Sequence, residues 1–131
     1  MNKILVVDDE EDILYLIEQM IEAIGFKPIL TNSFKEAIDI FEKERFGVLL
    51  SDLNLGNGNL DGCALCSRIK SIDSSVVAIA MSGYFTEMDL KYILGVGFTD
   101  FLMKPIGLDE LKTSIKCAFD RRNRWLKINQ T

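Results

Sequence analysis

Five short apolar runs alternate with longer amphipathic segments along the chain, and this alternation limits the possible folds more than any other feature. The runs are continuous in apolar residues, which is typical of strands covered on both faces. They span residues 4–7, 28–30, 47–50, 76–81 and 101–103. Because each crossover returns to the same edge with right-handed sense, the alternation predicts a single doubly wound (βα)5 domain, an α/β fold with a parallel sheet and helices on both faces.

Helices fill the intervals between these runs. Their apolar stripes cover residues 13–24, 37–41, 61–69, 90–94 and 111–119. Gly25 is expected to end the first helix, and Ser33 with Glu36 has the spacing of a capping box at the start of the second. Asp61 and Thr86 are the expected caps of the third and fourth helices.

Length and charge narrow the class of protein. The chain has 131 residues, enough for one domain that buries a core without disulfides or structural zinc. The formal net charge of −5 disfavours direct binding of nucleic acid and fits a metal or protein partner. The chain contains no histidine, which excludes Ser/His/Asp triads, Cys/His dyads and zinc sites built on histidine.

The apolar stretches and the cysteines indicate an ordinary cytoplasmic protein. No stretch reaches the roughly 18 apolar residues of a membrane span, and the acid Asp8 comes too early for a signal peptide. Cys63 and Cys66 have the C-x-x-C spacing of a redox pair. They also share one helical apolar pattern with Leu65 and Ile69, which favours thiols that fill the core.

The end of the chain differs from the rest. We expect a folded domain over residues 1–120 and a basic C-terminal tail, with one tryptophan, over residues 121–131. The tail has two interpretations. It is either the solvated last turn of the final helix, where cations favourably meet the helix C-terminus, or the start of a linker or a partner contact.

Polar side chains stand at the ends of four of the five runs. Asp8 and Asp9 follow the first run, Asp52 closes the third, Ser82 ends the fourth and Lys104 follows the fifth. Because the C-terminal ends of parallel strands share one edge, these groups are expected to converge on one small site. Clustered carboxylates repel one another unless a cation lies among them, and Mg²⁺ prefers such oxygen ligands.

The hydroxyl and ammonium groups fit the same site. A serine and a lysine supply the donors that the peripheral oxygens of a phosphoryl group require. Residues 10–12 add three more acids, which we interpret as the solvated first turn of the following helix, favoured by the helix dipole. Asp52 has no such explanation, because a glycine- and asparagine-rich loop follows it. The strand ends together predict a site for a divalent metal and a phosphoryl group.

With these residues the chain resembles the receiver domain of the two-component response regulators over nearly its whole length. The resemblance rests on the segments LVVDDE (5–10), SDLNL (51–55), DG (61–62), MSG (81–83) and DFLMKP (100–105). It implies a flavodoxin-like fold with five parallel strands in the order 2-1-3-4-5. In that order the ends of strands one and three meet at the topological switch point.

The resemblance also implies what the acids do. Asp52 would be the phosphoacceptor, Asp8, Asp9 and Asp52 would bind Mg²⁺, and Asn54 would lend its backbone carbonyl to the ion. The phosphoryl group would come from a sensor histidine kinase, a phosphotransfer protein or a small phosphodonor. The output would pass to a downstream protein or to the regulator's own output domain. Such a domain is a regulator that assists its own phosphorylation and dephosphorylation, not an enzyme, and needs neither nucleic acid nor membrane.

Further roles follow from the same resemblance. Ser82 and Lys104 would contact the phosphoryl group, and a cis bond would join Lys104 to Pro105. Phe101 would be the aromatic switch whose rotamer follows Ser82, so that the surface of the fourth helix, fifth strand and fifth helix changes. Tyr84 would flank the path of the water that removes the phosphoryl group, and its ring would obstruct that path.

The chain departs from the family pattern in three places. Gly56 stands where the family usually has a proline, and Asp61 lies nine residues after the phosphoacceptor position instead of seven, so we expect the loop 56–59 to be longer and more flexible. The switch residue is phenylalanine, without the hydroxyl of the usual tyrosine. Ser114 stands where dimerising members have an arginine, which predicts a monomer or a weak phosphorylation-dependent dimer.

Three other classes of protein compete with this interpretation. A haloacid-dehalogenase-like phosphatase would need an acid two residues after its nucleophile, where Asn54 stands. A flavin binder of the same fold would need a phosphate loop after the first strand, where five acids stand instead. A pseudo-receiver that docks without phosphorylation remains the serious alternative, although the complete set of acids, serine and lysine argues against it.

Overall fold

Strands and helices alternate along the chain as the sequence predicts. The computed structural model describes residues 2–56 and 60–130. Its strands are β1 (Lys3–Val7), β2 (Lys27–Thr31), β3 (Val48–Asp52), β4 (Val77–Ser82) and β5 (Phe98–Met103). Its helices are α1 (Glu11–Ile24), α2 (Phe34–Lys43), α3 (Asp61–Ile72), α4 (Glu87–Val96) and α5 (Leu108–Ile128). None of the helices in the described ranges is long and apolar enough to cross a membrane.

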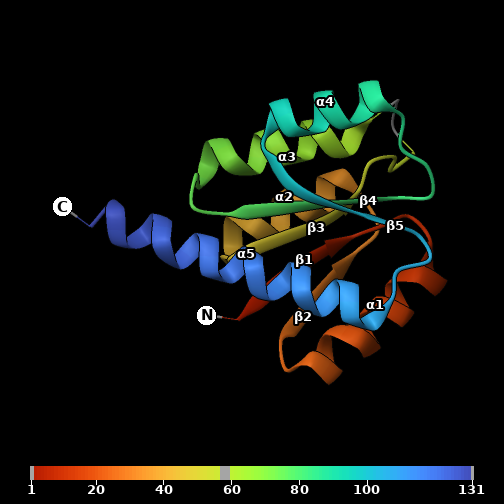
Figure 1. Cartoon of the computed structure of the whole chain (residues 1–131), viewed down its shortest axis with the longest axis horizontal. Helices are drawn as coiled ribbons and strands as arrows, with labels where there is room; N and C mark the ends of the chain where they lie inside the picture. The colour runs from red at the N-terminus through yellow and green to blue at the C-terminus, as the bar shows by residue number, and fades with distance from the viewer. Residues whose placement is uncertain (1, 57–59, 131) are drawn as a thin grey trace.

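The five strands form one parallel sheet in the order β2-β1-β3-β4-β5, which confirms the predicted fold. Helices α1 and α5 cover one face of the sheet, and α2, α3 and α4 cover the other (Figure 1). The strand order reverses between β1 and β3, where Val7 pairs with Ser51. Because the chain leaves these two strands toward opposite faces, the residues that follow them meet at the sheet edge where folds of this kind bind ligands.

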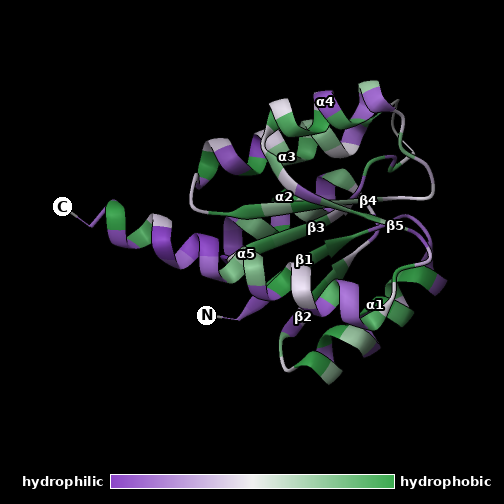
Figure 2. Cartoon of the chain, in the orientation of Figure 1, coloured by the Kyte–Doolittle hydropathy of each residue, from purple (hydrophilic) through white to green (hydrophobic). Residues whose placement is uncertain are grey.

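Alternating residues of each strand enter two separate cores. Ile4 and Val6 of β1 pack with α1 and α5, whereas Leu5 and Val7 pack with α2 and α3. All residues of β3 and β4 are buried. Figure 2 shows these hydrophobic strands between the two layers of helices. The strand ends that carry the polar side chains are therefore held by a packed frame.

Side chains and glycine mark several helix boundaries where the sequence predicts them. Helix α1 ends at Gly25, whose φ is 103°. Ser33 Oγ accepts a hydrogen bond from the Glu36 backbone N–H at 3.2 Å and so caps α2. At the start of α4, Thr86 and Asp89 form a complete capping box: each side chain accepts from the other's backbone N–H, at 3.0 and 3.1 Å.

Two predicted boundaries were wrong. The N-cap of α3 is Leu60, at a φ of 56°, and the Asp61 carboxylate accepts a hydrogen bond from the Leu55 backbone N–H instead of capping the helix. Strand β5 begins at Phe98, before the predicted run at residue 101. It lies at the edge of the sheet and alternates buried with exposed residues, so a continuous apolar run could not reveal its first half.

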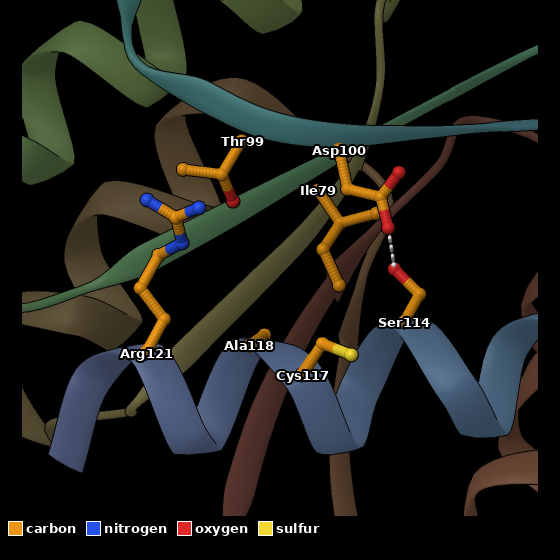
Figure 3. Close-up of a pocket in the computed structure, with 7 residues that line it drawn as sticks. All are labelled: Ile79, Thr99, Asp100, Ser114, Cys117, Ala118 and Arg121. Atoms are coloured by element: carbon orange, nitrogen blue, oxygen red, sulfur yellow. Dashed lines mark hydrogen bonds between the residues drawn. The ribbon is translucent and has the colours of Figure 1, made fainter. Parts of the chain in front are cut away.

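Helix α5 is the longest helix and continues through the basic segment to Ile128. Its C-terminal turns extend beyond the sheet (Figure 1). Nearer its start, Ser114 Oγ donates a hydrogen bond to Asp100 Oδ2 of β5 at 2.6 Å (Figure 3). This bond from a hydroxyl to a carboxylate occupies the position where the resemblance would place an ion pair between an arginine and Asp100.

The C-x-x-C cysteines fill the core, as predicted. Cys63 and Cys66 of α3 are buried and free, and Cys117 on α5 is exposed. Burial raises the pKa of the Cys63 thiol to about 11 and that of the Cys66 thiol to about 12. Both thiols are therefore protonated near neutral pH, the opposite of what a redox pair requires.

Candidate functional site

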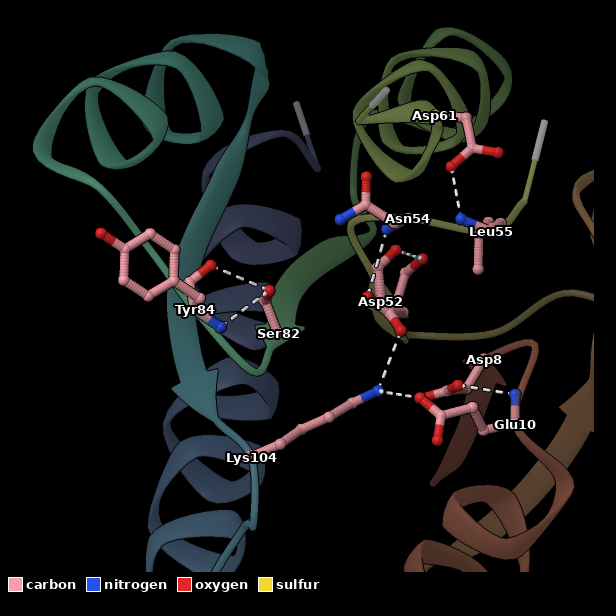
Figure 4. A network of polar contacts seen from close by, with 10 residues as sticks. Asp8, Glu10, Asp52, Asn54, Leu55, Asp61, Ser82, Tyr84 and Lys104 are labelled. Atoms are coloured by element: carbon pink, nitrogen blue, oxygen red, sulfur yellow. Dashed lines mark hydrogen bonds and ion pairs between the residues drawn. The ribbon is translucent and has the colours of Figure 1, made fainter. Parts of the chain in front are cut away.

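Three strands deliver one ammonium group and two carboxylates to a single point. Lys104 Nζ lies 2.7 Å from Asp8 Oδ2 and donates a hydrogen bond to Asp52 Oδ2 at 2.9 Å (Figure 4). Lys104 follows β5, Asp8 follows β1 and Asp52 ends β3. The Lys104–Pro105 peptide bond is cis, as the resemblance implies. The expected convergence of these strand ends is present in the structure.

A compact group of carboxylates surrounds this lysine. Asp8, Asp9, Glu10 and Asp52 each offer an oxygen, and these oxygens all lie within 4.8 Å of one another. Glu10 Oε1 is 3.8 Å from Lys104 Nζ. The sequence interpretation left Glu10 in the solvated first turn of α1 and missed its reach into the group. Its position directly after the Asp8–Asp9 pair was the available signal.

Asp8 shows that the group suits a cation. It is fully buried, its Oδ1 accepts from the Glu10 backbone N–H at 2.9 Å, and its Oδ2 forms the ion pair with Lys104. Burial raises the pKa of Asp8 above its usual value, although the Lys104 and Glu10 contacts oppose that rise. Four clustered acids with one lysine among them keep an excess of negative charge, which fits an oxygen-seeking divalent ion such as Mg²⁺.

Lys104 stays charged in this surrounding. Burial lowers its pKa, but the hydrogen bonds and charges of Asp8 and Asp52 outweigh burial, so the pKa of Lys104 is raised overall. The side chain is 13% exposed. A charged ammonium group therefore stands between two carboxylates at the C-terminal edge of the sheet.

Backbone contacts fix the position of Asp52 and of the loop behind it. Asp52 Oδ1 accepts from the Asn54 backbone N–H at 3.1 Å. Asn54 Oδ1 in turn accepts from the Leu60 backbone N–H at 3.1 Å, on the far side of the loop. With the contact between Leu55 and Asp61, this bond fastens the two ends of the loop together.

Gly62 allows α3 to approach Asp52 closely. A Cβ atom on Gly62 would lie 2.1 Å from the Asp52 carbonyl oxygen and 2.9 Å from Leu53 Cα. The Gly62 N–H donates to the Leu53 carbonyl at 2.9 Å. No larger residue fits this contact, which gives a physical reason for the Asp-Gly pair on which part of the resemblance rests.

Ser82 is close to the site, but its hydroxyl is engaged elsewhere. Ser82 Oγ donates to the Tyr84 carbonyl at 3.0 Å and accepts from the Tyr84 backbone N–H at 3.2 Å. In the described part of the chain the Ser82 hydroxyl has no hydrogen bond to Asp52 or Lys104. The Tyr84 side chain is exposed (72%) and extends away from these contacts (Figure 4).

Phe101 lies on the surface of β5 and is 39% exposed. Its ring is 5.2 Å from the ring of Phe85, with an angle of 58° between the ring planes. Phe85, in the segment between β4 and α4, was not singled out from the sequence. No local pattern predicts this contact, because it joins two segments that only the fold brings together.

Comparisons with known proteins agree with this geometry. A family model described as the response regulator receiver domain matches residues 4–116. This chain belongs to that family. Among relatives of the receiver domain, the transcriptional regulatory protein YxdJ of Bacillus subtilis (strain 168) is 32% identical over 121 residues, which make up 92% of this chain and 52% of that protein.

Solved structures show the same likeness. The CheY-like receiver domain protein from Methanospirillum hungatei JF-1 has a TM-score of 0.87 at 25% identity, covering 95% of this chain and 98% of its own. The beryllofluoride-activated receiver domain dimer of NtrC4 has a TM-score of 0.86 at 27% identity, covering 93% of this chain and 99% of its own. This receiver domain spans about half the length of the curated relatives it matches first.

The loop after Asp52 sets this receiver domain apart from the family pattern. Gly56, which stands in place of the usual proline, has a φ of 90°. Proline is locked near −65° and could not adopt this conformation. The expected flexibility of the loop concerns residues 57–59, which lie outside the described ranges.

Proposed function

We propose that this receiver domain accepts a phosphoryl group on Asp52 from a phosphohistidine of a sensor histidine kinase or phosphotransfer protein. The observation that carries the proposal is the Lys104 ammonium group held between the carboxylates of Asp8 and Asp52 at the C-terminal edge of the sheet. In the transfer, an Asp52 carboxylate oxygen forms a bond to phosphorus as the bond from phosphorus to the imidazole nitrogen breaks. Positioning and charge neutralisation do most of the catalytic work in such reactions.

Asp8, Asp9, Asp52 and the backbone carbonyl of Asn54 would hold Mg²⁺. The buried Asp8 carboxylate and the spacing of the four acids support this assignment. When bound, the ion supplies positive charge that offsets repulsion between Asp52 and the incoming phosphoryl oxygens. Glu10 is close enough to the group to assist, and it was not among the residues predicted to do so.

Lys104 and Ser82 would bind the remaining phosphoryl oxygens. Lys104 already donates to Asp52 Oδ2, so a phosphoryl group on Asp52 needs only a small movement of this side chain. Ser82 must first release both of its contacts with Tyr84. The hydroxyl is therefore the element that distinguishes the phosphorylated state from the unphosphorylated state.

The output is a change at the surface formed by α4, β5 and α5. When Ser82 turns toward the phosphoryl group, Phe101 leaves its exposed position and enters the space that opens. A downstream protein, or an output domain of a longer regulator, would read this change. YxdJ, which this chain matches over about half of its length, is named a transcriptional regulatory protein, and this favours an output that controls transcription. We expect a monomer or a weak phosphorylation-dependent dimer, because Asp100 is already bonded to Ser114.

Incubation with acetyl phosphate and Mg²⁺, followed by intact-mass measurement, tests the proposal. We expect the mass of one phosphoryl group on the native chain and none on the Asp52→Asn variant, whose amide is nearly isosteric. The label should be lost in acid and require Mg²⁺. A native chain that never acquires the label would favour the alternative of a docking module that works without phosphorylation.

A further inference from the structure

A second cleft lies at the edge of the sheet opposite Asp52. It has a volume of about 330 Å³, and its walls come from the end of α3, the α3–β4 turn, the first residues of β4 and β5, and the C-terminal half of α5. The site with Lys104 is at the C-terminal ends of the strands, whereas Val77 and Thr99 in this cleft stand at the starts of theirs. The two sites therefore share no residue.

The charge of this cleft is opposite to that of the domain. Residues 121–131 hold four of the 15 lysines and arginines and none of the 20 acids, so residues 1–120 carry a formal charge of −9. Yet Lys70 and Arg121 line the cleft, and among the described residues no acidic side chain does. Neither cation has a carboxylate partner within the described ranges. Two such cations in an otherwise acidic domain favour an anion between them.

The donors of the cleft are largely available. Lys70 Nζ uses one of its three hydrogens, on the Val76 carbonyl at 2.9 Å. The Arg121 side chain rises from α5 toward β5, with its guanidinium group beside Thr99 (Figure 3), and donates no hydrogen bond within the described chain. The hydroxyl of Ser74 is on the exposed turn and also unused. A phosphate or carboxylate group needs donors of this kind.

Apolar side chains form much of the remaining wall, beside the polar residues Ser75 and Thr99. Val76, Val77 and Trp125 line the cleft. Trp125, the only tryptophan of the chain, is 38% exposed. Mostly apolar walls with a few convergent polar groups are typical of small-molecule sites, and the volume of this cleft is within their usual range of roughly 300–1,000 Å³. An aromatic wall of this kind suits a flat ring.

We propose that this cleft binds a small anionic molecule that carries a phosphate or carboxylate group on a flat apolar ring. The anion lies between Lys70 and Arg121, and the ring lies against Trp125. The ligand is distinct from the phosphoryl group of the signalling reaction and binds at the opposite end of the sheet.

Tryptophan fluorescence of the full chain tests this site directly, because Trp125 is the only tryptophan. Adenosine monophosphate is the phosphate probe and benzoate is the carboxylate probe, each titrated with excitation at the red edge of the tryptophan band. We expect a saturable change with at least one of them, and the responding probe identifies the anion. Adenosine and inorganic phosphate, given separately, should bind at least about tenfold more weakly, since each lacks one of the two contacts.

Two variants locate the anion, and a third is the matched control. Arg121→Gln and Lys70→Gln should each weaken binding about tenfold, or 1.4 kcal/mol. Arg124→Gln removes an exposed charge from the same helix, outside the cleft, and should leave binding unchanged. The proposal fails if neither probe gives a saturable change, if adenosine binds as tightly as its phosphate, or if Arg124→Gln weakens binding as much as Arg121→Gln.

Discussion

The rings of Phe85 and Phe101 are in contact, 5.2 Å apart and inclined at 58°. Phe101 is partly exposed on β5, whereas Phe85 is packed against the core. Phe101 has no phenolic hydroxyl, so no hydrogen bond to that ring can hold its exposed rotamer. Packing against Phe85 is therefore the contact that we expect to hold the exposed rotamer.

Replacing Phe85 by alanine should release Phe101 from its exposed position. A contact between two aromatic rings contributes about 0.5–1.5 kcal/mol beyond the buried area, so the inward population should rise several-fold without any phosphoryl group. Side-chain NMR signals of Phe101 in the unphosphorylated protein measure this population.

Phe26→Ala is the matched control for this variant. It removes a ring contact of similar length, 5.0 Å from Phe119, on the face of the sheet covered by α1 and α5. The control should lower stability and leave the Phe101 signals in place. If both variants move those signals equally, the contact with Phe85 has no specific part in the switch.

Removing Lys104 should destabilise the domain in a way that Mg²⁺ partly reverses. In Lys104→Ala the buried carboxylates of Asp8 and Asp52 lose their cation, at a cost of about 3 kcal/mol in the free energy of unfolding. A divalent ion can then offset part of the repulsion. Urea unfolding with and without Mg²⁺ measures both effects.

Lys3→Ala breaks the partly exposed ion pair with Glu44 and serves as the control. It should lower the free energy of unfolding only slightly, and Mg²⁺ should not change that value.

In Lys104→Ala we also expect phosphorylation to persist, while beryllofluoride no longer shifts the amide signals of α4 and β5. An unchanged response there would refute the coupling role of Lys104.

The exposed ring of Tyr84 should lengthen the lifetime of the phosphoryl group. Its backbone holds Ser82 and its side chain is free, so Tyr84→Ala removes the ring while retaining the backbone contacts. We expect loss of the label to become several-fold faster, a change of about 1 kcal/mol in the barrier. Tyr92→Ala removes another exposed ring, on α4, and should not change the decay. An equal or slower decay in Tyr84→Ala would contradict the shielding role.

Replacement by alanine should lower the stability of the fold at Gly62 and raise it at Gly95. Gly62→Ala forces a methyl group against the backbone of Asp52 and should cost about 3 kcal/mol and slow labelling. Gly95 is in α4 with nothing within 4 Å of an added Cβ, so Gly95→Ala should stabilise the fold by up to about 1 kcal/mol. Thermal unfolding of both variants measures these changes in stability. If Gly62→Ala is as stable as the native chain, α3 can move away from Asp52.

Stability should fall steeply in alkali because of the buried thiols. Burial raises the pKa values of Cys63 and Cys66 to about 11 and about 12 in the folded state, above the usual 9.0. As pH rises beyond 9.0 the unfolded chain loses these protons first, so unfolding becomes easier by about 1.4 kcal/mol per pH unit for each thiol. In the Cys63→Ala/Cys66→Ala double variant, the free energy of unfolding should no longer show this dependence on pH. If the free energy of unfolding falls equally steeply with pH in the native chain and the double variant between pH 8 and 10, burial of the thiols does not cause the loss of stability.

The backbone position of the site could be predicted from the sequence, and the directions of several side chains could not. Asp8, Asp52 and Lys104 follow strands of a parallel sheet, so the fold alone brings them to one edge. The hydroxyl of Ser82 also stands at a strand end, yet it is bonded to Tyr84. A rotamer depends on neighbours that come from other segments, and periodicity carries no information about them.

Local chemistry explains the other differences. Thr86 was correctly predicted as a cap because the whole capping box lies within four residues. Asp61 is also a residue type that favours helix N-caps, but its carboxylate accepts the N–H of Leu55, which lies across the loop. Contacts closed by a loop cannot be inferred from spacing alone.

Helix α5 connects the two ends of the domain as a single beam. Its 21 residues, at a rise of 1.5 Å each, make it about 30 Å long, from the loop after Pro105 to the turn beyond Trp125. A tilt of only about 4° around its middle displaces the two ends by about 1 Å in opposite directions. If a repacking beside Lys104 tilts α5 as a rigid body, the far edge of the sheet is displaced as well, with no relay of side chains between them.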